Sequence, residues 1–127
     1  LFGTYSGAVV PELGFTSGNQ IGKRPDMNGA HGIKGYRYGK RDPRWTATIE
    51  AELEATHPFW ADLRNRTEWP LNGKVGSVDG NIVQAWVRRA STVGNALQDK
   101  ENILHYGLSG QALFVPGKSD NIEIIVR

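Results

Sequence analysis

Three glutamates at every second position are the residues of this sequence whose spacing could support acid–base chemistry. Glu50, Glu52 and Glu54 stand in the stretch RWTATIEAELEATHPFW, which begins at Arg44. Two neighbouring carboxylates can act as general acid and general base in a catalytic site. Alternate residues of a β-strand share one face, however, and a one-sided sheet carries its charged residues on the side that faces water. We therefore interpret the three glutamates as the polar face of a strand.

The histidines, serines and glycines of the sequence complete no catalytic or ligand-binding motif. His31, His57 and His105 share no spacing typical of metal ligands, and isolated histidines often have structural roles. The chain has no cysteine, which excludes a thiolate zinc site, a cysteine nucleophile and disulfide bonds. Walker A, dinucleotide-binding and Gly-x-Ser-x-Gly patterns are also absent from the sequence. These observations predict a protein that is not an enzyme and that binds no cofactor or metal ion.

Basic residues gather in a glycine-rich part of the chain. Seven Lys and Arg residues stand against two Asp residues between Lys23 and Arg44, although the net formal charge of the whole chain is only +2. Such a segment can contact nucleic acid or an acidic neighbour, or it can serve only as a solvated loop. Glycine disfavours order in strands and helices. We therefore expect residues 1–43 to form a basic, Gly-rich arm or loop region, with one short strand near Tyr5–Val10.

The stretch from Arg44 to Thr67 combines a strand pattern with a helix pattern. Apolar residues occupy every second position up to Leu53, which predicts a strand over Arg44–Glu54. His57 precedes Pro58, and a residue before proline avoids the α-helical region. A short helix over about residues 57–66, capped by Thr56, is therefore expected after the strand. The residues predicted to form the core of this unit are Trp45, Ile49, Leu53, Phe59, Trp60 and Leu63.

The remainder of the chain has the pattern of short strands joined by turns. Asp79-Gly80 predicts a two-residue hairpin turn between strands at Val75–Val78 and Ile82–Val87. Residues 92–103 are expected to form a polar connection, and two further strands are expected after it. The fold class that follows is mainly β, a β-sandwich or barrel with one short flanking α-helix. Residues 44–127 are expected to form this unit, and no apolar run is long enough to span a membrane.

The order of these elements resembles the C-terminal part of bacteriophage tail tube (major tail) proteins. The resemblance covers roughly residues 44–127 and is a similarity of pattern rather than of a catalytic signature. It is carried by Gly80-Asn81, Asp99–Asn102, Gly110–Leu113 and Ser119–Ile125. Since the sequence begins at Leu1, we also expect it to be a fragment of a longer chain.

The resemblance implies a non-enzymatic structural protein of a phage or prophage tail. Proteins of this family assemble as hexameric rings that stack into a hollow tube, so the implied partners are further copies of the chain and other tail proteins. DNA would pass through the lumen without specific binding, and assembly would take place in the bacterial host cytoplasm before the protein resides in the virion tail. The acidic face would then line the lumen or face solvent. The arm residues expected to contact the next subunit are Lys34, Tyr36, Arg37, Tyr38, Lys40 and Arg41.

Two other classes of function also fit the sequence. A β-sandwich that binds a sugar or glycan would expose Trp69 and Trp86 close to one another. A basic nucleic-acid-binding barrel would instead fold the segment Lys23–Arg44 onto one face beside exposed aromatic residues.

Overall fold

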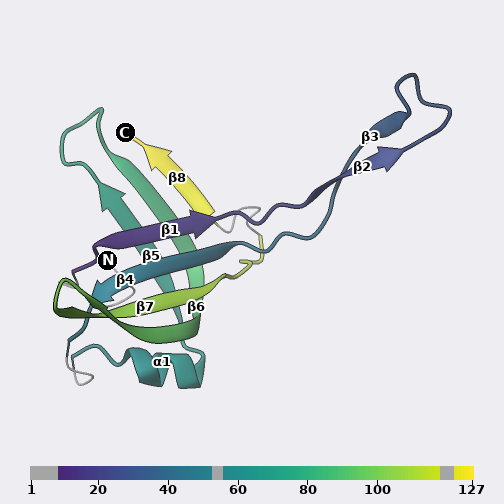
Figure 1. The fold of residues 1–127 in the computed structure, drawn as a ribbon. Helices are drawn as coiled ribbons and strands as arrows, with labels where there is room; N and C mark the ends of the chain where they lie inside the picture. The colour runs from purple at the N-terminus through teal and green to yellow at the C-terminus, as the bar shows by residue number, and fades with distance from the viewer. Residues whose placement is uncertain (1–8, 53–55, 118–121) are drawn as a thin grey trace.

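The computed structural model describes residues 9–52, 56–117 and 122–127, and in this part of the chain it is mainly β with one short helix (Figure 1). The predicted fold class, a β-sandwich or barrel-like architecture with one flanking helix, is confirmed. The elements are β1 (Glu12–Thr16), β2 (Ile21–Pro25), β3 (Ile33–Tyr38), β4 (Arg44–Glu50), α1 (Phe59–Asn65), β5 (Glu68–Val75), β6 (Val83–Lys100), β7 (Ile103–Ala112) and β8 (Ile122–Val126).

Six of the strands form one strongly bent antiparallel sheet. Its order is β1-β4-β7-β6-β5, and β8 pairs with the first half of β6 on the side away from β5. The pairing of β6 with β7 shifts register between Thr92 and Gly94, and an extra residue of this kind bends a strand. The two halves of the 18-residue strand β6 therefore belong to two layers that run across one another (Figure 1).

The core lies between these two layers, and helix α1 covers one end of it (Figure 1). In β4, Trp45, Ala47 and Ile49 are buried, as the alternation predicted. They join Leu71 of β5 and residues of β6 and β7 in one apolar cluster. Helix α1 adds Phe59, whose ring meets the ring of Tyr106 edge to face, with the centroids 5.7 Å apart.

The end of β4 and the start of the helix differ from the prediction. The strand ends at Glu50 rather than Glu54, and Oε2 of Glu52, beyond its end, lies 2.7 Å from Nδ1 of the buried His57. The helix begins at Phe59 with Pro58 as N-cap, and no side chain of the described residues caps it, so Thr56 does not have the expected role.

The helix also divides the predicted core residues between its faces. Trp60 is 37% exposed and lies at the rim of the core rather than in it. Because consecutive helical residues lie about 100° apart around the axis, Trp60 points to the side when Phe59 points inward, and its ring meets that of Tyr106. Leu63 is half-buried, whereas Leu53 and Glu54 lie outside the described residues.

The two hairpin connections after the helix also differ from the prediction. The expected polar connection at residues 92–103 is mostly strand, because β6 continues to Lys100 and pairs with β7 along its second half. The turn is Glu101-Asn102, with φ values of 57° and 63°, as a type I′ turn requires. The β5–β6 connection is longer than the expected two-residue turn: Val75 and Val83 are the last paired residues, and Asp79-Gly80 lies inside the loop between them.

The first 43 residues contain more strand than their glycine content indicated. Strand β1 belongs to the main sheet, where Gly14 pairs with Thr46 of β4. A Cβ on Gly14 would lie 2.8 Å from Oγ1 of Thr46, so the missing side chain permits the close pairing. Strands β2 and β3 form a separate two-stranded sheet that projects from the body (Figure 1).

Candidate functional site

The projecting hairpin, here called the arm and comprising residues 18–42, is the most extended feature of the described chain. Its backbone ladder pairs Ile21 with Tyr38 and Lys23 with Tyr36. The ladder continues to the base of the arm, where the amide nitrogen of Asp42 donates to the carbonyl oxygen of Gly18. Figure 1 shows β2 and β3 extending far from the six-stranded sheet. The arm therefore presents both of its faces at a distance from the body.

The two faces of the arm differ in chemistry because alternate residues of paired strands share a face. One face carries Ile21, Lys23, Tyr36 and Tyr38. The two tyrosines are 65% and 80% exposed, which is unusual for side chains with so much apolar surface. The opposite face carries Arg24 and Arg37 next to glycines. The arm can therefore bury aromatic surface on one side and pair with negative charge on both.

The base of the arm is held by a small polar network. Arg44 donates to the carboxylate of Asp42 from Nη2 at 2.7 Å and from Nε at 3.0 Å, and Gln111 Nε2 lies 3.4 Å from the other carboxylate oxygen. The hydrogen bonds from Arg44 lower the pKa of Asp42 below its ordinary value. Arg41 donates from Nε to Asn19 at 3.1 Å. The contacts of Asp42 tie the arm to β4 and β7, and the contact of Arg41 with Asn19 joins the two strands of the arm.

Gly18 permits the close approach of the two strands at this base. Its φ is +57°, and a Cβ there would lie 2.1 Å from the carbonyl oxygen of Asp42. A backbone atom cannot move aside as a flexible side chain can. The base of the arm therefore has no room for a side chain at this position.

We expect Gly18→Ala to change the direction of the arm without unfolding the body. Assembly, if the arm mediates it, should weaken at least about tenfold, because a displaced interface loses well-packed contacts. Sedimentation velocity measures the assembly, and thermal unfolding monitored by tryptophan fluorescence measures the body. Gly32→Ala is the matched control, since Gly32 also has a positive φ but nothing lies within 4 Å of a Cβ there. Equal behaviour of the two variants would show that the base does not orient the arm.

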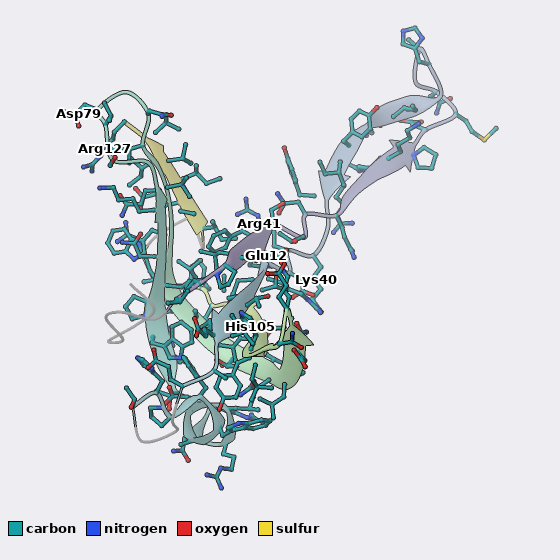
Figure 2. The ribbon with its side chains drawn as sticks, turned by 60° about the vertical axis from the view of Figure 1, so that its left-hand side comes forward. Glu12, Lys40, Arg41, Asp79, His105 and Arg127 are labelled. Atoms are coloured by element: carbon teal, nitrogen blue, oxygen red, sulfur yellow. The ribbon has the colours of Figure 1, made fainter. Side chains whose placement is uncertain are left out.

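The structure brings the predicted arm residues together on this one feature. Lys34, Tyr36, Arg37 and Tyr38 lie on β3 and are exposed. Lys40 and Arg41 lie where the arm joins the six-stranded sheet (Figure 2). The carbonyl oxygen of Lys40 accepts a hydrogen bond from the backbone amide of Gln20. Lys40 and Arg41 therefore belong to the base of the arm rather than to its outer part.

The predicted acidic face is not a continuous row of glutamates. Glu50 is half-buried on the face of β4 that points away from the core, and Glu52 instead contacts His57. Nearby on the outer face of the sheet is an open hollow of about 400 Å³ with a predominantly polar lining. The lining includes Glu12, Thr46, Thr48, Gln98, Gly107 and Ser109. The face is thus polar and rich in hydroxyl groups, with carboxylates at its edge.

His57, His105 and Trp69 occupy buried, structural positions. His57 stacks on Phe59, and Nδ1 of His105 lies 2.8 Å from the carbonyl oxygen of Ile103. Trp69 is buried against Trp45, with ring centroids 5.3 Å apart, so it is not exposed beside Trp86 as a glycan-binding module would require. In the described ranges, no three His, Asp or Glu side chains gather closely enough to hold a metal ion.

Two exposed apolar surfaces were not anticipated from the sequence. One is a row of Val75, Val83 and Val126, which pair across β5, β6 and β8. The other lies at the β6–β7 turn, where Leu97 and Leu104 are exposed close to Trp60. The second surface could not be recognised from the sequence, because polar residues surround Leu97 and residues 92–103 therefore resemble a loop. Only the pairing of β6 with β7 shows that Leu97 and Leu104 share a face.

Comparisons with known proteins add no family assignment. No model of a protein family matches the chain, and no curated protein matches it either. In the described part of the chain, no helix combines the length and the apolar character needed to cross a membrane.

Proposed function

We propose that this protein is a non-enzymatic structural protein of a phage or prophage tail, which assembles with copies of itself into rings or a tube. The observation that carries the proposal is the arm: two paired strands that project from the body with their aromatic side chains exposed. The resemblance of residues 44–127 to tail tube proteins gives the proposal its specific form, a hexameric ring that stacks into a tube. The virion tail is the corresponding location.

The arm has a physical reason to bind another molecule. An isolated two-stranded hairpin is at best marginally stable in water, because it buries little apolar surface. The arm carries exposed Ile21, Tyr36 and Tyr38, and tyrosine is among the residues that contribute most to binding energy at interfaces. Packing the arm on a partner would therefore both stabilise the hairpin and form the interface.

The charge distribution favours a second copy of the chain as that partner. The arm, residues 18–42, contains six Lys and Arg and two Asp, which gives +4, whereas the whole chain has +2 and the remainder therefore −2. The basic arm of one copy is therefore attracted to the acidic remainder of another copy. A contact between two different surfaces is head-to-tail, and such contacts generate closed rings or open filaments.

The polar outer face of the sheet suits the wall of a channel that conducts DNA. Thr46, Thr48 and Ser109 offer neutral hydroxyl groups, while Glu12 and Glu50 add negative charge that repels phosphate. DNA affinity depends mainly on Lys and Arg contacts with phosphate. A lumen lined by this face would therefore let DNA slide without binding it.

The test is the assembly state of the purified protein as a function of concentration. We expect sedimentation velocity to show a species several times heavier than the 14.0 kDa chain, and negative-stain images to show rings or tubes. A strict monomer at high concentration, with the arm protected from proteolysis, would contradict the proposal.

A second candidate is a protein that binds nucleic acid through the arginine face of the arm. Arg24 and Arg37 lie on that face, and the exposed tyrosines could stack on bases from the other. This function predicts DNA affinity that falls steeply with salt concentration. Titration of a fluorescent oligonucleotide at two salt concentrations distinguishes it from self-assembly.

A further inference from the structure

The exposed apolar surface at the β6–β7 turn has a defined composition. Leu97 pairs with Tyr106, and Asp99 pairs with Leu104, so these four residues share the face that points toward the core. Tyr106 is buried and meets Trp60 edge to face, with the ring centroids 6.4 Å apart. Here we call the residues Trp60, Leu97 and Leu104 the shelf. Leu97 and Leu104 are 54% and 51% exposed, so the core-side face of the sheet continues beyond what α1 covers.

The shelf lies at the acidic end of the molecule. Asp99 is on the same face as the leucines, Glu101 is in the turn, and Glu50 is at the adjacent end of β4. Lys100 is the only basic residue between Leu97 and Leu104. Strand β4 leads from the base of the arm at Arg44 to Glu50, which pairs with His105 near this turn. The basic arm and the acidic shelf are therefore at opposite ends of one sheet (Figure 1).

We propose that the shelf is the docking surface for the arm of a second copy of this chain. The inference rests on the proposed self-assembly and adds the surface that receives the arm. Tyr36, Tyr38 and Ile21 of one copy lie against the shelf of the next, and Lys23 from the same arm face pairs with Asp99.

The composition of the arm favours the shelf over the valine row as its docking surface. The tyrosine face of the arm combines Ile21, Tyr36 and Tyr38 with the cation Lys23, and the two leucines of the shelf share their face with the anion Asp99. The valine row on β5, β6 and β8 offers apolar contact alone, since its next row is Gly73, Ala85 and Ile124. The valine row itself carries no charge, and Asp79 in the adjacent loop lies beside Arg127 (Figure 2), so a basic arm gains less from that surface than from the shelf.

Cysteine cross-linking tests the contact directly, since the natural chain has no cysteine. Tyr38→Cys is mixed with Leu97→Cys, or with Val83→Cys as the matched control on the valine row, and treated with a short bis-maleimide linker. We expect a heterodimeric product with Leu97→Cys at least about tenfold in excess of that with Val83→Cys. A preference for Val83→Cys, or equal yields, would overturn the proposal.

A charge exchange separates this inference from the proposed function. We expect Asp99→Lys to weaken assembly about tenfold, and Lys23→Asp in the same chain to restore it, because a close charge pair that is reversed on both sides remains attractive. Sedimentation velocity of wild type, the two single variants and the double variant measures this. If wild type assembles and the double variant shows no rescue, the docking surface is wrong while self-assembly stands. If wild type does not assemble at all, both proposals fail.

Discussion

Replacing residues 21–38 with an Asn-Gly turn is expected to give a folded protein that remains monomeric. Gln20 and Gly39 are already hydrogen-bonded across the arm, so a two-residue turn joins them in register. The six-stranded sheet keeps all of its strands, because β2 and β3 pair only with each other in the sheet topology. We expect the free energy of unfolding to change by less than about 1 kcal/mol, since none of the replaced residues is buried.

The measurement is sedimentation velocity across a range of concentrations, together with chemical unfolding. The double variant Tyr36→Ala/Tyr38→Ala keeps the length of the arm and should weaken assembly about 100-fold or more, as expected for two aromatic residues at an interface. Val75→Ala is the control, because it removes an exposed apolar side chain from a different hairpin. If the shortened protein assembled at the same concentrations as the wild type, the arm would have no part in assembly.

The buried residues of β4 could be predicted from the sequence because one face of this strand packs on the core and the other does not. Trp45, Ala47 and Ile49 face the core at alternate positions, and each is buried. The same alternation was extended too far, to Glu54, since a sequence pattern does not reveal that Glu52 contacts His57. That contact depends on where the chain turns, which is set by tertiary packing.

The arm was located in the sequence but its form was not. Its glycines and basic residues indicated a loop, whereas β2 and β3 pair in a regular ladder. Glycine weakens a strand by its backbone entropy, yet Gly22 and Gly35 each face a paired residue on the opposite strand. Pairing between residues far apart in sequence is not encoded in the composition of either segment.

The shelf could not be predicted from the sequence for a related reason. Leu97 and Leu104 share a face only because the Glu101-Asn102 turn sets the register of β6 and β7. Two consecutive non-glycine residues with positive φ are uncommon, and a glutamate gives no sequence signal for such a turn. A shift of register by one residue between β6 and β7 would have placed Leu97 and Leu104 on opposite faces.

Trp45→Ala is expected to have the largest effect on stability of any single substitution considered. The Trp45 side chain is 1% exposed, meets Trp69 edge to face and covers Gly110, where a Cβ would lie 2.5 Å from its ring. Removing a buried aromatic side chain costs about 3–5 kcal/mol, a large part of the about 5–15 kcal/mol that stabilises a typical domain. Urea unfolding followed by circular dichroism measures the loss.

Trp60→Ala is the matched control, because it removes the same side chain from a position that is 37% exposed. We expect it to cost less than about 2 kcal/mol, since much of the ring already contacts water. If the shelf receives the arm, however, Trp60→Ala should weaken assembly although the protein stays folded, whereas Trp45→Ala should lower stability and assembly together. Equal losses of stability in the two variants would mean that the core is not centred on Trp45. If folded Trp60→Ala assembles as the wild type does, the indole of Trp60 is not part of the docking surface, and the two leucines alone form it.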